Sequence, residues 1–211
     1  MKNKRSRFFE RHEQFENILK DKQFEEFRGV YSQIKYYNYL KLFGPFRSTA
    51  QKFSFKYFLQ LPSSVISFFY LLRYINSKKN WIFLSGRNNI DGKDKYLFKY
   101  QDNSVIWHYG PSINYKIINI ILFKILILLF SHLPLYGLKI IEFKNLIPDD
   151  LYNNYPIRKI REYYLWCKFW KITFLLFKPT EIYFTSLNFF LPLIKSADDL
   201  NIKTIEVAHA F

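Results

Sequence analysis

The chain has 211 residues, 49% of them hydrophobic and 21% aromatic, so it can bury one large core or two small ones. Its net charge of +15 favours an anionic partner such as nucleic acid, a membrane surface or a phosphorylated substrate; the alternative is a solvated surface rich in lysine. Cys167 is the only cysteine, which excludes an internal disulfide and a thiolate zinc site. We expect it to fill a buried position in a reducing, cytoplasmic compartment.

Residues 1–80 are predicted to form a helical, basic, aromatic-rich segment. Apolar side chains between Phe8 and Phe27 recur at helical spacing along one face. A second helix is predicted through 65–75, with Ser63 or Ser64 as its N-cap.

An α/β domain is predicted over residues 81–211. Its first segment, Trp81 to Ser85, is a short apolar run closed by Gly86, which is typical of a strand buried on both faces. Asp91-Gly92 favours a hairpin turn, and 104–107 is predicted to be another buried strand.

The most apolar segment is 117–130, IINIILFKILILLF, in which Lys124 is the only charge. Three interpretations stay open: a fully buried core helix, which the interruptions at His132 and Pro134 favour, a helix in the membrane interface, or a membrane span reaching Leu138.

A long helix is predicted over 156–177. Its second half is apolar nearly all round apart from Lys168 and Lys171, which indicates burial or contact with lipid.

The last segment has the pattern of a βαβ unit. A strand is predicted over 181–185, a helix over 189–200 with Asn188 as a cap and Asn201 at its end, and a strand over 203–208. Together these elements span about 30 residues, the usual length of such a unit. Two parallel strands need a crossover of this kind, so we expect a parallel sheet.

Candidate binding residues follow three of these strands, since ligands bind beyond the carboxyl ends of strands in open α/β sheets. The first group is Ser85, Gly86 and Arg87, suited to a close approach to a phosphate. Ser186 and Asn188 stand at the start of a helix, where free N–H groups favour an anion.

His209 follows the last strand and is the candidate general base, because the pKa of a histidine lies near neutrality; it can equally be a residue exposed at a loop or terminus. Glu206 is expected to face the other way and to form an ion pair inside a buried strand. His108 is a weaker candidate, and His12 and His132 are expected at the surface and at a helix end.

No motif for dinucleotide binding, a P-loop, serine hydrolysis or metal binding occurs, so we expect no cofactor and no metal.

The segment KPTEIYFTSLNFFLPLIKSADDLNIKTIEVAHAF resembles the end of the N-terminal domain of GT-B-type glycosyltransferases of bacterial capsule and surface-polysaccharide synthesis. The likeness rests on Lys178-Pro179, on the helix end at 197–202, and on 204–207 followed by His209. Upstream, WIFLSGRNNIDGKDKY is similar to the family's first strand and hairpin. The sequence departs from the family at Ala208 and Ala210, where the family has Gln and Gly.

The resemblance implies a Rossmann-like half of a GT-B fold that transfers a sugar from a nucleotide-sugar donor to a glycan or lipid-linked acceptor. It also implies that His209 contacts donor or acceptor. The chain would lack the C-terminal partner domain, which a separate chain would have to supply.

Two further interpretations remain beside the glycosyltransferase. Basic residues and the helices at 117–130 and 163–177 predict a peripheral position on the inner face of the cell membrane, and they also suit a non-catalytic membrane-surface protein. Nucleic-acid binding is permitted by charge, but no recognition motif occurs, so we expect no specific nucleic-acid partner.

Overall fold

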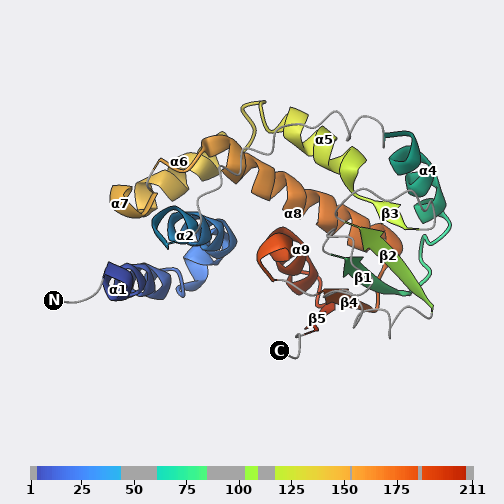
Figure 1. Cartoon of the computed structure of the whole chain (residues 1–211), viewed down its shortest axis with the longest axis horizontal. Helices are drawn as coiled ribbons and strands as arrows, with labels where there is room; N and C mark the ends of the chain where they lie inside the picture. The colour runs from blue at the N-terminus through green and yellow to red at the C-terminus, as the bar shows by residue number, and fades with distance from the viewer. Residues whose placement is uncertain are drawn as a thin grey trace. The chain divides into compact units, whose positions relative to one another are not determined.

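A computed structural model describes residues 4–43, 61–84, 103–108, 117–152, 154–184 and 187–207 (Figure 1). Its elements in chain order are α1 (Lys4–Ile18), η1 (Lys22–Phe27), α2 (Arg28–Phe43), α4 (Leu61–Leu72), β1 (Asn80–Leu84), β2 (Ser104–His108), β3 (Ile118–Asn119), α5 (Ile121–Phe130), α6 (Gly137–Leu146), α7 (Asp149–Tyr152), α8 (Ile157–Phe177), β4 (Glu181–Phe184), α9 (Leu187–Asp198) and β5 (Lys203–Glu206).

The chain divides into two compact units. Unit 1 comprises residues 1–50 and 133–163, and unit 2 comprises 51–132 and 164–211. Helix α8 begins in unit 1 and continues in unit 2. Helix α4, which the sequence pattern groups with the N-terminal segment, belongs by its contacts to unit 2.

Unit 1 is helical in its described parts. The predicted apolar face is confirmed for Phe8, Phe15, Leu19 and Phe27, which are buried, whereas Phe9 is exposed because it lies about 100° further round the helix. Polar contacts add to this core: Asn38 Nδ2 donates a hydrogen bond to the carbonyl of Leu151 over 2.7 Å, which ties α2 to α7.

His12 was predicted at the surface, and this prediction is wrong. The side chain is 2% exposed, and a hydrogen bond of 2.5 Å joins its Nδ1 to the hydroxyl of Tyr31. The reason is its position: His12 is four residues after Phe8, on the same face of α1. Burial, helped by the charge of Lys35, lowers the pKa of His12 to about 4.

Unit 2 is an α/β structure with a five-stranded, all-parallel sheet in the order β3-β2-β1-β4-β5. The predicted class and parallel pairing are confirmed, and the sheet flanked by helices is consistent with a Rossmann-like fold. The prediction that the first strand is buried on both faces is also confirmed, since Trp81, Ile82, Phe83 and Leu84 are all buried.

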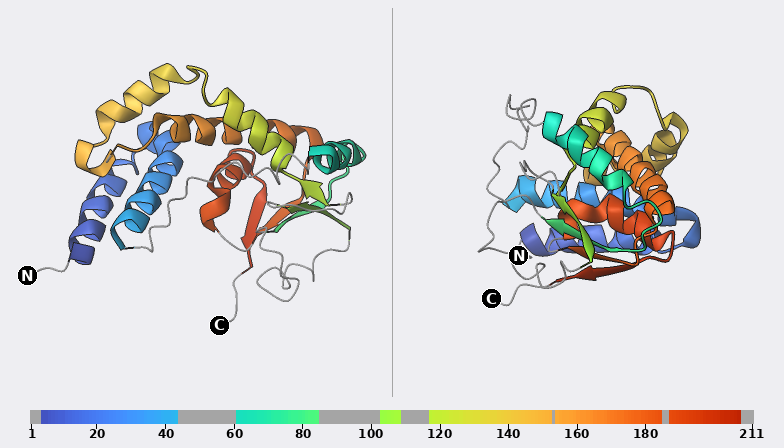
Figure 2. Two further views of the ribbon diagram at one scale, coloured as in Figure 1. Left: turned by 45° about the horizontal axis from the view of Figure 1, so that its top comes forward. Right: turned by 90° about the vertical axis from the view of Figure 1, so that its right-hand side faces the viewer.

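The main core of unit 2 lies on one face of the sheet, under α4, α8 and α9, which gather on one side of the strands (Figure 2). It is strongly aromatic. The ring of Trp107 lies 4.9 Å from that of Trp81 and 5.2 Å from that of Trp170, measured between centroids. The other face carries a smaller cluster around Ile82, Leu84 and Tyr183.

The apolar segment 117–130 is not a single buried helix. Its first residues form β3, and α5 begins only at Ile121. Leu126, Leu129 and Phe130 are exposed, so the expectation of full burial is wrong. Across all helices of the described ranges, none has the length and hydropathy required to cross a bilayer.

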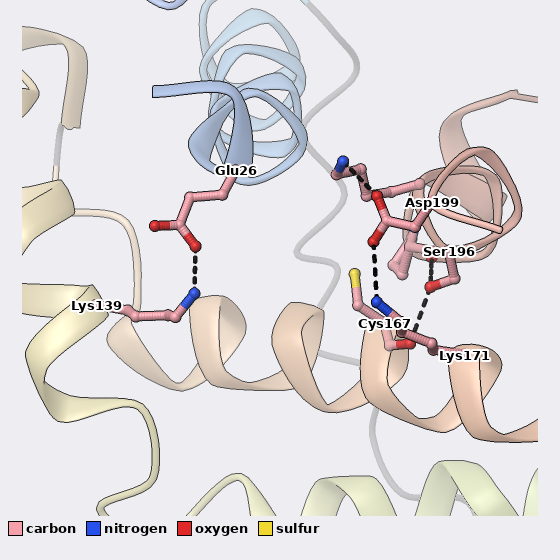
Figure 3. A network of polar contacts seen from close by, with 8 residues as sticks. Glu26, Lys139, Cys167, Lys171, Ser196 and Asp199 are labelled. Atoms are coloured by element: carbon pink, nitrogen blue, oxygen red, sulfur yellow. Dashed lines mark hydrogen bonds and ion pairs between the residues drawn. The ribbon is translucent and has the colours of Figure 1, made fainter. Parts of the chain in front are cut away.

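Polar contacts join α9 to the second half of α8 (Figure 3). The hydroxyl of Ser196 donates to the carbonyl of Cys167 over 2.9 Å, and Lys171 Nζ lies 3.8 Å from a carboxylate oxygen of Asp199. Cys167 was expected to be buried, but it is half-buried instead.

Candidate functional site

The candidate site is the carboxyl edge of the sheet, where the strand order reverses. From β1 the chain continues to β2 and β3 on one side, whereas β4 and β5 lie on the other side. In doubly wound sheets, ligands bind at such a reversal, in the crevice outside the carboxyl ends of the two central strands. Here those strands are β1 and β4.

The strand register brings the carboxyl ends of the three strands that precede the predicted residues to one edge. Phe83 of β1 is level with Phe184 of β4, which is level with Glu206 of β5. The backbone N–H of Val207 donates to the carbonyl of Phe184 over 2.8 Å and extends this pairing by one residue. The three strands therefore end side by side, as predicted.

The candidate residues themselves follow these ends in the sequence. Ser85, Gly86 and Arg87 come directly after β1. Ser186 lies between β4 and α9, and His209 comes three residues after β5. These five residues lie outside the described ranges, so their roles stay predictions.

Asn188 falls inside helix α9, because the helix begins one residue earlier, at Leu187. The prediction that Asn188 caps this helix is therefore wrong, since an N-cap residue precedes the first helical residue. Asn188 still lies in the first turn, at the end of α9 that adjoins the carboxyl edge of β4.

The end of α9 sets where β5 begins. Asn201 has a positive φ of 54°, the left-handed conformation that commonly ends a helix. Its N–H donates to the carbonyl of Asp198, and the N–H of Ile202 donates to that of Ala197. This Schellman arrangement confirms Asn201 as the helix end and directs the chain into the strand that precedes His209.

Glu206 does not lie in a buried strand, contrary to expectation. β5 is the edge strand of the sheet, and the Glu206 side chain is exposed. Its carboxylate is solvated, so burial does not require a partner. At the other end of the same strand pair, Lys203 Nζ lies 2.8 Å from Glu181 Oε1, and this contact lowers the pKa of Glu181.

His108 is the histidine that the structure describes at the candidate edge. It is the last residue of β2, level with Leu84 of β1, and it is buried. Alternation along β2 places it on the sheet face of Ile82 and Leu84, opposite Trp107. An imidazole there can hydrogen-bond a hydroxyl or phosphate oxygen that enters the crevice.

Asn119 is a residue at this edge that sequence reasoning missed. It ends β3, level with His108, and is 1% exposed. Its Oδ1 accepts a hydrogen bond from the N–H of Ile121, two residues on, over 2.9 Å, which forms a turn just before α5. One signal was available: Asn119 is the only uncharged polar residue in 117–130 and marks a helix start.

Two serines of α4 form hydrogen bonds with the backbone of Asn119. Ser64 Oγ donates to the carbonyl of Asn119 over 2.9 Å, and Ser67 Oγ accepts from the N–H of Asn119 over 3.1 Å. The expected role of Ser64 as the cap of α4 is wrong, because the helix begins at Leu61 and Ser64 lies within it.

The edge thus offers backbone groups, a histidine and an asparagine. Within the described ranges, no cluster of three or more His, Cys, Asp or Glu side chains is placed to hold a metal ion. The arrangement suits binding of a polar, hydroxyl-bearing or phosphorylated ligand by hydrogen bonds.

Comparison with models of known protein families found none that matches the chain, and comparisons with curated proteins and with solved structures also found no match.

Proposed function

We propose that this chain is the N-terminal half of a GT-B-type glycosyltransferase of bacterial capsule or surface-polysaccharide synthesis. It takes part in transferring a sugar from a nucleotide-sugar donor to a glycan or lipid-linked acceptor. The observation that carries the proposal is the reversal of strand order between β1 and β4, with Ser85 and Ser186 following those two strands. This is the position at which a doubly wound sheet binds its ligand.

In this proposal, His209 removes the proton from the attacking acceptor hydroxyl. Ser85, Gly86 and Arg87 contact phosphate or sugar oxygens, and Ser186 and Asn188 add the N–H groups at the start of α9. The parallel pairing of β1, β4 and β5 supports the proposal, because the carboxyl ends of these three strands lie side by side at one edge.

This function requires a second Rossmann-like domain. Transfer needs donor and acceptor held together in reactive geometry, and one Rossmann-like half encloses only one side of the crevice. We therefore propose that a second domain supplies the donor contacts, at the cytoplasmic face of an anionic membrane.

The test is a transfer assay on the chain combined with the product of the downstream reading frame. We expect donor-dependent incorporation of labelled sugar into acceptor, and His209→Ala should lower turnover by about 100-fold or more, the usual contribution of a general base. Lys203→Ala is the matched control, because Lys203 lies at the opposite end of the same strand, and it should keep full turnover. Equal turnover of the two variants would remove His209 from catalysis.

A non-catalytic membrane-surface protein is the second candidate. Exposed apolar side chains on α4 and α8 of unit 2 favour it. The two candidates differ in one result: the second predicts no donor-dependent transfer with any downstream product.

A further inference from the structure

Helix α4 exposes a stripe of large apolar side chains. Ile66 and Phe69 are 56% and 63% exposed, and Val65 and Leu72 are exposed as well; Ile75, three residues after the helix end, is also exposed. The opposite face of the helix buries Ser64, Ser67 and Leu71 against the rest of unit 2. The helix is therefore apolar on its outer face, where a solvated helix would be polar.

The second half of α8 has the same property. Trp170, Phe174 and Phe177 are buried in the core, whereas Ile172, Leu175 and Leu176 are each at least half exposed. Lys168 is exposed four residues before Ile172, on the same side of the helix.

The two helices come close together at one end. The backbone N–H of Asn76, just after α4, donates to the carbonyl of Leu176 over 3.3 Å. The helices are also joined through α5, since the ring of Phe123 lies 5.6 Å from that of Phe68 and 4.6 Å from that of Phe169. We call the exposed apolar side chains of α4 and of the second half of α8 the α4–α8 face.

The segments that form and adjoin this face carry basic residues only. Residues 61–80, 117–132 and 164–180 contain no Asp or Glu. The same ranges contain seven basic residues, which are Arg73, Lys78, Lys79, Lys124, Lys168, Lys171 and Lys178. One carboxylate approaches from a neighbouring segment: Asp199, the residue directly after α9, lies beside Lys171. The chain has 17 acidic residues elsewhere, so this part of unit 2 is selectively basic.

We propose that the α4–α8 face binds the surface of an anionic lipid bilayer. Apolar side chains enter the boundary between head groups and acyl chains, and Lys and Arg extend to the phosphates. The binding free energies from the apolar side chains and from the basic residues add, because each basic residue near an anionic surface contributes independently of the buried apolar area.

A second copy of this chain suits the face less well. A symmetric contact would place the same basic residues of both copies against each other, and like charges across an interface oppose association. Charge complementarity therefore favours an anionic bilayer.

This inference rests on the proposed function, because it names the surface by which the chain would bind the anionic membrane. Binding is measured with vesicles alone, without donor or acceptor sugar. Absence of vesicle binding would overturn this inference but not the proposed transfer reaction. Absence of transfer with intact vesicle binding would overturn the transfer reaction but not this inference.

The experiment is flotation of the full chain with vesicles of phosphatidylcholine alone or mixed with phosphatidylglycerol. We expect binding to the anionic vesicles only. Phe69→Ser combined with Leu175→Ser should weaken it by about tenfold or more, because two large apolar side chains no longer enter the bilayer. Arg73→Gln combined with Lys168→Gln should weaken it by about 25-fold, from roughly fivefold for each charge.

Unit 1 offers a matched control. Leu138 and Ile141 of α6 are 79% and 56% exposed, as apolar as the residues changed above, so Leu138→Ser combined with Ile141→Ser should keep full binding. Circular dichroism checks that each variant is folded. Three results would each overturn the proposal. The first is equal binding to both kinds of vesicle, and the second is an equal loss of binding in the unit 1 control. The third is a dimer that only the α4–α8 variants dissociate while vesicle binding persists.

Discussion

The two units expose apolar side chains to a similar degree but surround them with different charges. In unit 1, cations find carboxylate partners: Arg11 pairs with Asp150, Lys35 with Glu16 and Lys139 with Glu26. In unit 2, the helices α4 and α5 and the second half of α8 contain no acidic residue. Apolar exposure alone therefore does not indicate a lipid surface; the charge around it separates the two units.

The units also differ in what they bury. Unit 1 contains a buried polar pair, His12 and Tyr31, whereas the main core of unit 2 consists of aromatic and aliphatic side chains. All four tryptophans, at 81, 107, 166 and 170, lie in unit 2. Tryptophan fluorescence thus reports on unit 2, and circular dichroism reports on the helices of both units, so the comparison can be tested unit by unit.

Trp107→Ala should have the largest effect. The side chain is 1% exposed and packs against Trp81, Phe83 and Trp170. Its loss leaves a cavity that costs about 3–5 kcal/mol of unfolding free energy. Urea denaturation followed by the fluorescence of the other tryptophans measures it. A loss below about 1 kcal/mol would contradict the view that this core stabilises unit 2.

Acid should destabilise unit 1 through His12. Its pKa is about 4 in the folded chain, lowered by burial and by Lys35 and partly restored by Glu16 and Asp150, against 6.5 when unfolded. Between pH 4 and 6.5 only the unfolded state binds the proton. The contribution of His12 to the unfolding free energy is therefore present in full above pH 6.5 and falls as pH decreases towards 4. Denaturation monitored by circular dichroism should show this slope, and His12→Gln should flatten it. An unchanged slope would show that other groups cause it.

Gly29→Ala should destabilise unit 1 by about 1–3 kcal/mol. A Cβ at this position would lie 1.7 Å from the hydroxyl of Tyr163, which is buried and has little room to move. The better helix propensity of alanine, about 1 kcal/mol, offsets only part of this cost.

Gly137→Ala, at the start of α6, is the control, because a Cβ there meets nothing within 4 Å. It should be neutral or slightly stabilising by circular dichroism. Equal effects of the two substitutions would argue against close packing at Gly29.

Lys35→Gln should have the smallest effect. Lys35 Nζ lies 2.8 Å from Glu16 Oε1 at a half-buried site, and such pairs contribute up to about 1 kcal/mol. The difference from the parent chain should shrink as salt is raised, because added ions screen the pair. A difference that is independent of salt would point to packing of the lysine stem instead.

Much of the fold could be predicted from local pattern. Three features are specified by short stretches of sequence. They are the buried strand at 81–84, the βαβ unit of the last segment and the helix end at Asn201. Because a βαβ unit joins parallel strands, the parallel sheet and its carboxyl edge could also be predicted from the sequence. The residues proposed to act there, Ser85 and His209 among them, remain predictions supported by the strand ends that precede them.

The sequence by itself therefore determined the strands β1 and β4 and the long helix α8, because side-chain periodicity encodes what each segment can bury. The tertiary structure alone decided that β1 and β4 are neighbours, that Asn119 ends a strand, that His12 is buried and that Glu206 is exposed at the sheet edge. These features depend on pairing between residues far apart in the chain, and no short-range pattern specifies which partner a segment will meet.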